Sequence, residues 1–164
     1  MGYIGRSGGA GGADTCLEVG VKRYLKDNNL GEHIQEGLME IFLPWENFNK
    51  RDSDEDGYYT LSFSPYKSKA YALAEEIHPA WDRCSNGAKS LHSRNTMQIL
   101  GERLDVPSKF ILCYGVPEKK GSVIPKGGTR TACILGQQHG VQIFNLHVEE
   151  HLERVVKWIN ETSD

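Results

Sequence analysis

The chain has 164 residues, of which 38% are hydrophobic and 25% are charged, as in an ordinary soluble globular protein. This length predicts one domain, spanning 1–164, that buries roughly 70% of the surface its unfolded form exposes. No apolar run approaches the ~18 residues of a membrane span. The first residues lack the basic and apolar regions of a signal peptide, so we expect a cytoplasmic protein with no membrane partner. With a net charge of −3, we do not expect it to coat nucleic acid.

Short apolar runs rich in β-branched and aromatic residues alternate with stretches whose apolar residues recur three and four apart. The first pattern predicts buried strands and the second predicts helices packed on a sheet. This order predicts an α/β fold with an open, mainly parallel sheet, which binds ligands outside the carboxyl ends of its strands. In chain order we expect a strand at 3–7, a helix at 14–28, a strand at 38–45, helices at 66–78 and 88–103, a strand at 109–116, a helix at 129–139, a strand at 141–146 and a helix at 148–162.

A glycine-rich segment, "GRSGGAGGADT", which we call loop 1 (residues 5–15), follows the first predicted strand. Glycine allows positive φ and lets the backbone approach a ligand with no Cβ in the way. The next helix is expected to begin at Asp14 or Thr15, and the unpaired N–H groups of a helix start attract an anion. The glycines that would line this site are Gly8, Gly9, Gly11 and Gly12.

A second glycine-rich segment, "PKGGTRT", which we call loop 2 (residues 125–131), opens the predicted helix 129–139. It repeats the chemistry of loop 1 at the same predicted sheet edge. The geometry of a tight turn alone would also explain the glycines of either loop. Neither loop matches the P-loop pattern or the dinucleotide fingerprint, so these two nucleotide folds are excluded.

Five segments together are similar to the SLOG superfamily, which includes DNA-processing protein A and the LOG ("lysine decarboxylase-like") phosphoribohydrolases. The resemblance covers most of the chain. It implies a Rossmann-like sheet with helices on both faces, whose glycine loops hold the phosphate and ribose of a nucleotide or nucleotide-derived molecule. The segments are "RSGGAGGADT", "EIFLPWENFN", "HPAWDRCSNGAKSLHSRNTMQILG", "PSKFILCYG" and "GGTRTACILGQQHGVQIFNL".

Two LOG motifs can be followed residue by residue. Arg94 in "HSRNTM" resembles the arginine of M-H-x-R-K-x-x-M, which helps to hold the sugar-phosphate, although Asn95 replaces the lysine. Loop 2 resembles the motif P-G-G-x-G-T-x-x-E through Gly127, Gly128 and Thr131. The catalytic glutamate of that motif is absent, because "GGTRTACI" has a cysteine and an isoleucine there. The resemblance therefore leaves open whether the ligand is only bound or also cleaved by an N-glycosidase reaction.

Members of the superfamily usually begin with one more strand and helix that carry a "G-I-G-S-R"-like loop. This chain starts after the position of that unit, so we expect an uncovered sheet edge. Unpaired edges favour pairing with another chain. A homodimer is the expected assembly.

Cleavage would need a carboxylate near the glycosidic bond. Asp14 and Glu46 are the candidates that would act with Arg94, and Glu18 and Asp82 are further carboxylates to consider. Asp14 has an alternative role as a helix N-cap, Glu46 as a solvated loop charge, and Arg94 as half of a surface salt bridge.

Ligand binding is expected from the two loops and from the predicted helix 88–103. An arginine fork fits phosphate oxygens, which makes the arginines in and beside the loops candidates. Trp45 and Trp81 could stack on a base, although large aromatic side chains more often pack in a core or its rim. The predicted binding residues are Arg6, Ser7, Gly8, Gly9, Gly11, Gly12, Asp14, Thr15, Arg94, Asn95, Gly127, Gly128, Thr129, Arg130 and Thr131.

Metal binding is not expected from the sequence. The four cysteines are far apart and form no C-x-x-C pair, which argues against a zinc ribbon or a disulfide framework. "HVEEH" (147–151) has the spacing of a zinc motif that places two histidines on one helix face, but too little chain follows it for a third ligand. "DSDEDG" (52–57) begins like an EF-hand loop, but Phe63 stands at the twelfth position in place of glutamate. We predict no metal and no cofactor.

The leading hypothesis is a small nucleotide-binding domain that senses, sequesters or cleaves its ligand. The alternative, from the resemblance to DNA-processing protein A, is binding of single-stranded DNA. The acidic balance and the lack of lysines interleaved with aromatics argue against that alternative.

Overall fold

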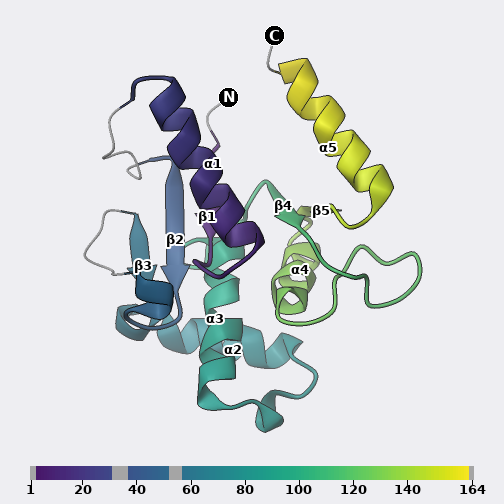
Figure 1. The fold of residues 1–164 in the computed structure, drawn as a ribbon. Coiled ribbons are helices and arrows are strands. Elements are labelled where there is room, and N and C mark those ends of the chain that lie inside the picture. Colours follow the sequence, from purple (N-terminus) through teal and green to yellow (C-terminus); the bar gives the residue numbers. More distant parts are fainter. Residues whose placement is uncertain (1–2, 31–36, 52–56, 163–164) are drawn as a thin grey trace.

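The computed structural model describes residues 3–30, 37–51 and 57–162 (Figure 1). The chain has a mixed α/β fold in which strands and helices alternate. In order, the elements are β1 (Gly5–Ser7), α1 (Ala13–Asp27), β2 (Met39–Leu43), the 3₁₀ helix η1 (Phe48–Lys50), β3 (Tyr58–Thr60), η2 (Leu61–Phe63), α2 (Lys67–Ile77), η3 (Trp81–Arg83), α3 (Asn86–Leu100), β4 (Phe110–Cys113), α4 (Thr129–Gln138), β5 (Gln142–Asn145) and α5 (Glu149–Thr162).

All paired strands in the described residues are parallel, as predicted. They form a three-stranded sheet in the order β1-β2-β3 and a two-stranded sheet of β4 and β5. No backbone ladder joins the two sheets within the described part of the chain.

Side chains connect β1 to the start of β4. The rings of Tyr3 and Phe110 lie edge to face with centroids 5.4 Å apart. Arg6 in β1 donates through Nη1 to the carbonyl of Val106 at 2.7 Å, and its Nε donates to Glu40 at 2.6 Å. The two sheets are thus neighbours along β1 and β4, with an arginine side chain rather than a backbone ladder between them.

The alternation of side chains along β2 explains how helices cover both faces of the first sheet. Met39, Ile41 and Leu43 are buried against Leu17 and Val21 of α1, which runs alongside β2 in Figure 1. Phe42 points to the other face, because successive residues of a strand alternate. It joins the main core, which continues through α2, α3, both strands of the second sheet and α4.

The predicted helices agree with the structure to within two or three residues at each end. The predicted strands are longer than the observed ones; 109–116, for example, is reduced to Phe110–Cys113. β3 was not predicted, because three residues are too few for a periodic pattern to emerge. Among the described helices, none is both long and apolar enough to cross a bilayer.

Candidate functional site

Loop 1 turns sharply between β1 and α1. Gly9 and Gly12 have φ of 63° and 85°, a conformation that glycine adopts without steric cost. The helix begins at Ala13, with Gly12 as the N-cap and no side-chain cap. The helix starts one residue before the predicted Asp14, and the alternative of an Asp14 N-cap is wrong because Gly12 holds that position. The first turn of α1 has no side-chain cap, and Gly11 and Gly12, which precede it, are exposed.

Arg94 of α3 lies directly beneath loop 1. Its side chain is 4% exposed, and a Cβ on Gly8 would collide with Nη1 of this arginine. Nη1 lies 3.7 Å from Oδ2 of Asp14, and the guanidinium carbon lies 5.9 Å from the centre of the Phe48 ring. Neither Nε nor Nη1 donates a hydrogen bond within the described residues. Burial lowers the pKa of Arg94 from its ordinary value to about 10, against a smaller opposing effect of Asp14, so the group is a buried cation at neutral pH.

The carboxylate of Asp14 is held between loop 1 and α3. Its Oδ2 accepts a hydrogen bond from the amide of Ala10 at 3.2 Å, and its Oδ1 accepts one from Nε2 of Gln98 at 3.3 Å. The side chain is 22% exposed. Asp14 therefore presents a fixed, partly solvated carboxylate beside Arg94.

The next residue of α3 reaches loop 2. Nδ2 of Asn95 donates to the carbonyl of Gly128 at 3.0 Å. Arg94 and Asn95 are consecutive residues of α3, so α3 contacts loop 1 through one of them and loop 2 through the next.

Loop 2 leads into α4, which begins at Thr129 as predicted. Gly127 has φ of 85°. The N-cap is Gly128, again with no side-chain cap. Gly127, Gly128 and Thr129 are exposed, and a Cβ on either glycine would meet no atom within 4 Å in the described structure. The amides at the start of α4 are thus accessible to a ligand.

Thr131 is buried at the start of α4 and points to α3 rather than to solvent. Its Oγ1 lies 2.9 Å from Nδ1 of His92. Burial, with smaller effects of His78 and Arg94, lowers the pKa of His92 below its usual 6.5. Thr131 therefore supports the wall of the site, and His92 is neutral at physiological pH.

The segment after β2, residues 47–51, holds loop 1 in place through hydrogen bonds and an ion pair, and we call it the clamp. The sequence does not predict these contacts. Asn49 donates through Nδ2 to the carbonyl of Gly9 at 2.9 Å. Arg51 pairs with the buried Glu18 at 2.8 Å, and Glu18 accepts a further hydrogen bond from Ser7 at 3.2 Å. This carboxylate is therefore occupied in holding the loop and is not placed for catalysis.

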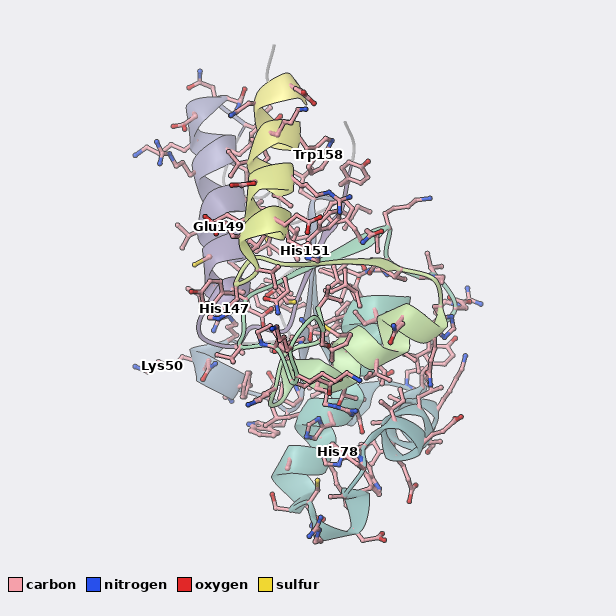
Figure 2. The ribbon with its side chains drawn as sticks, turned by 90° about the vertical axis from the view of Figure 1, so that its right-hand side faces the viewer. Lys50, His78, His147, Glu149, His151 and Trp158 are labelled. Carbon is pink, nitrogen blue, oxygen red and sulfur yellow. The ribbon has the colours of Figure 1, made fainter. Side chains whose placement is uncertain are left out.

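Three residues of this clamp have left-handed backbone: Asn47, Asn49 and Lys50 have φ of 58°, 52° and 62°. Asparagine tolerates this region, whereas lysine adopts it rarely. Lys50 is exposed at the outer end of the segment (Figure 2). The two asparagines in "WENFNK" are the signal from which the turn could have been predicted.

Two predicted arginines are directed elsewhere. Arg6 is committed to Glu40 and Val106, as described above, and therefore joins the two sheets instead of lining loop 1. Arg130 is partly exposed and pairs with Glu118 at 3.0 Å, which leaves it at the rim of loop 2. Thr15 donates to the carbonyl of Ala10 at 2.9 Å and so stabilises loop 1.

The remaining acidic and aromatic candidates are spread over the site and its surroundings. Glu46 is half-buried shortly after β2, in the segment that brings Phe48 to Arg94. Asp82 is exposed in η3. Trp81 is buried against Tyr71, whereas Trp45 is 37% exposed, with its ring edge to face with Phe48. Trp45 is therefore the aromatic side chain best placed for a base.

The structure places the histidines of the first metal pattern, "HVEEH", but most of the second pattern, the acidic turn 52–57, lies outside the described residues. His147 lies outside α5, which begins at Glu149, and Nδ1 of His151 accepts a hydrogen bond from the amide of Asn145 at 3.1 Å (Figure 2). The expectation that both histidines share one helix face is therefore wrong. Residues 52–56 of the acidic turn lie outside the described residues.

A third group of metal-binding side chains was missed. His78, Cys84 and His92 each offer a ligand atom within 4.8 Å of the others. Their spacing in the sequence resembles no zinc motif, because they are brought together by the packing of α2, η3 and α3.

Comparison of the chain with protein-family models, with curated proteins and with solved structures finds no match.

Proposed function

We propose that this chain is a SLOG-type domain that binds a nucleotide or nucleotide-derived small molecule, with the phosphate held between loops 1 and 2. The observation that carries the proposal is Arg94: its buried guanidinium lies under Gly8, and its Nε and Nη1 donate no hydrogen bond to any described residue, with the Asp14 carboxylate 3.7 Å from Nη1. Leaving a buried charge without hydrogen bonds costs free energy. A phosphate would supply the missing acceptors, and arginine fits it in a bidentate fashion.

The helix starts on either side support the same ligand. α1 and α4 both begin after a glycine without a side-chain cap, and the N-terminus of a helix favours an anion by about 0.3–1 kcal/mol, more where it is partly buried. Arg94 lies beneath loop 1 and Asn95 is hydrogen-bonded to loop 2, and we infer from this that the amides of both loops contact one phosphate-bearing molecule. Trp45 is the candidate for stacking on the base.

We also propose that the two sheets are halves of one Rossmann-like open sheet in the order β3-β2-β1-β4-β5. The neighbouring positions of β1 and β4, through Tyr3, Arg6 and Val106, support this order. In it, the strand order reverses beside β1, where loops 1 and 2 follow β1 and β4. Ligands of open α/β sheets bind at such a switch point.

Cleavage of the ligand is compatible with the proposal but needs a carboxylate. Asp14 is held beside Arg94 and is partly solvated, so it would be the group that steadies an oxocarbenium-like sugar or activates water. Glu46 is the second candidate. A nucleotide N-glycosidase would release free base from a nucleoside monophosphate, which chromatography at high protein concentration detects. If no base is released from any of a panel of nucleotides, the chain binds without cleaving.

Calorimetric titration tests the binding itself. The panel should contain adenosine phosphates, ADP-ribose and cyclic nucleotides, with adenosine as the control that lacks phosphate. We expect at least one phosphate-bearing compound to bind and adenosine to bind at least ten-fold more weakly. Equal binding of AMP and adenosine, or no binding of any compound, would contradict the proposal.

The DNA-binding alternative and the expected homodimer can be tested on the same protein. A gel shift with single-stranded DNA that weakens steeply with salt and is unaffected by the nucleotide would favour the DNA-binding alternative instead. The homodimer stays a prediction, and light scattering of the full chain measures it directly.

A further inference from the structure

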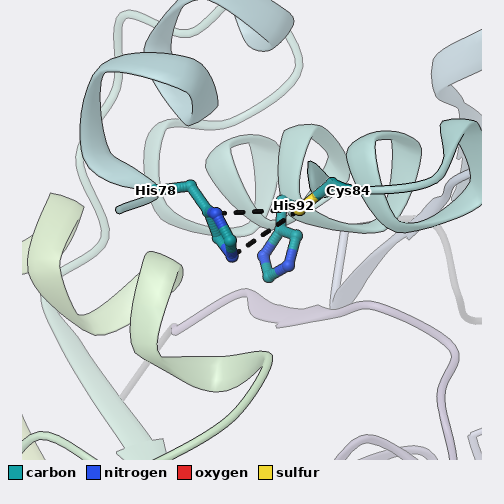
Figure 3. Close-up of side chains that lie close together, drawn as sticks. All are labelled: His78, Cys84 and His92. Carbon is teal, nitrogen blue, oxygen red and sulfur yellow. Dashed lines mark hydrogen bonds between the residues drawn. The ribbon is translucent and has the colours of Figure 1, made fainter. Parts of the chain in front are cut away.

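A group of three metal-binding side chains lies beside loop 2, at the junction of α2, η3 and α3. His78 follows the end of α2, Cys84 follows the end of η3, and His92 lies in α3. All three are half-buried, and their ligand atoms all lie within 4.8 Å of one another. Figure 3 shows the two imidazole rings and the thiol facing a common space.

The separations suit a tetrahedral ion. With metal–sulfur and metal–nitrogen bonds of about 2.3 and 2.0–2.1 Å, neighbouring ligand atoms are roughly 3.3–3.6 Å apart. Sγ of Cys84 lies 3.7 and 3.9 Å from the two ring nitrogens of His78. The ring centres of His78 and His92 are 4.3 Å apart. Since the ligand atoms lie within 4.8 Å of one another, binding would draw them together by up to about 1 Å.

Ligation would keep some of the hydrogen bonds around the group and replace others. Nδ1 of His92 lies 2.9 Å from Oγ1 of Thr131; in the tautomer with the proton on Nδ1, this nitrogen donates to Thr131 and Nε2 is the ligand atom. Sγ of Cys84 lies 3.5 Å from the carbonyl of Ala80. Ligation of His78 through Nδ1 would replace its 3.2 Å hydrogen bond from the amide of Ala80.

We propose that His78, Cys84 and His92 bind one Zn²⁺ ion, with the fourth position open to water or to an oxygen of a ligand. One thiolate and two imidazoles form a set that zinc prefers, and three protein ligands with one open position are typical of zinc sites that do chemistry. Binding replaces the proton of the Cys84 thiol, which passes to solvent.

The zinc site lies beside the proposed phosphate site between loops 1 and 2, but the zinc proposal does not depend on that site. His92 lies half a turn before Arg94 on α3, and its partner Thr131 belongs to loop 2. A zinc-bound water or ligand oxygen would therefore lie at the edge of loop 2. The zinc proposal rests on the three ligands alone and stands whether or not a nucleotide binds.

Cobalt substitution tests the proposal. The full chain is stripped with a chelator and titrated with Co²⁺, which reports a thiolate ligand by a charge-transfer band and a tetrahedral site by intense visible bands. We expect both to saturate at one equivalent and to disappear when Zn²⁺ is added. Cys84→Ser should abolish the charge-transfer band, whereas Cys16→Ser, which changes the exposed cysteine of α1, should retain it.

A matched pair of histidine variants tests the imidazole ligands. His78→Ala should weaken Co²⁺ binding at least ten-fold, and His139→Ala, which removes an exposed histidine at the end of α4, should leave it unchanged. Absence of the bands in the wild-type chain, or a charge-transfer band that survives in Cys84→Ser, would overturn the proposal.

A second measurement covers the case in which a variant does not fold. X-ray absorption of the wild-type chain with one equivalent of Zn²⁺ should show one sulfur at about 2.3 Å and nitrogen or oxygen neighbours at about 2.0 Å, and a shell without sulfur would refute the site. Arg94→Met should bind Co²⁺ like the wild type even where it loses nucleotide binding, so failure of either proposal is recognised separately.

Discussion

At the scale of single residues, Arg94 is the side chain whose position most needs a reason. A buried cation is expensive unless it is paired and hydrogen-bonded. Here its Asp14 partner lies at 3.7 Å, and two nitrogen atoms have no acceptor among the described residues. Stability alone does not favour this arrangement, whereas the anion that we propose to bind here would supply the missing acceptors.

Replacement of Arg94 by methionine separates these two roles. Methionine has a similar length and adapts to irregular cores, and it removes the cost of the buried charge. We expect the free energy of unfolding, measured with urea, to stay within about 1 kcal/mol of the wild type or to rise. A loss of about 3–5 kcal/mol, as for a broken buried ion pair, would instead mark Arg94 as structural.

The lowered pKa of Arg94 predicts how the binding of a phosphate ligand changes with pH. The ligand favours the protonated guanidinium, so the pKa in the complex is higher than the value of about 10 in the free chain. Affinity should therefore be nearly constant between about pH 7 and 9 and fall by up to about ten-fold per unit above pH 10. Calorimetry across this range measures it, with Arg94→Met as the control in which this decline is missing. A wild-type affinity that does not fall above pH 10 would argue against contact between Arg94 and the phosphate.

At the scale of elements, the sequence predicts the helices and the two glycine loops better than it predicts the contacts between distant segments. Helical periodicity and the glycines give α1, α4 and both loops almost as observed. β3 and the clamp of Asn49 and Arg51 on loop 1 depend on contacts between segments far apart in the chain, which local patterns do not contain. For the same reason the sequence includes Arg6 in the site, although the structure directs it to Glu40.

Glycine at position 8 is predicted to be required by α3 rather than by the loop itself. Its φ is not positive, but a methyl group there would collide with Arg94. Gly8→Ala should lower the free energy of unfolding by about 1–3 kcal/mol, the usual cost of overpacking. The control is Gly11→Ala, where a Cβ meets no atom of the described structure within 4 Å and a change within about 0.5 kcal/mol is expected. Equal effects of the two substitutions in denaturant unfolding would contradict the placement of Arg94.

At the scale of the whole molecule, α3 connects loop 1, loop 2 and the proposed zinc site. It contacts loop 1 through Arg94, loop 2 through Asn95 and the proposed zinc site through His92. It also packs in the main core, through Met97, Ile99 and Leu100. A helix anchored in this way holds both sites rigidly relative to one another.

Zinc should therefore stabilise the whole chain. An ion that binds the folded state and not the unfolded one raises the melting temperature by an amount that grows with the logarithm of its free concentration above the dissociation constant. We expect Zn²⁺ to raise the melting temperature of the stripped wild-type chain by several degrees and to have no such effect on Cys84→Ser. Differential scanning calorimetry, with Cys16→Ser as the control that keeps the shift, makes this comparison. An equal shift in Cys84→Ser would place the stabilising ion elsewhere.

We propose that loops 1 and 2 hold one phosphate-bearing ligand over Arg94. A crystal structure of the chain with the nucleotide that binds best in titration is the most direct test. It should show a phosphate within about 3.2 Å of the Arg94 guanidinium and of amides at the starts of α1 and α4. A nucleotide bound away from both loops, with Arg94 still lacking an acceptor, would contradict it.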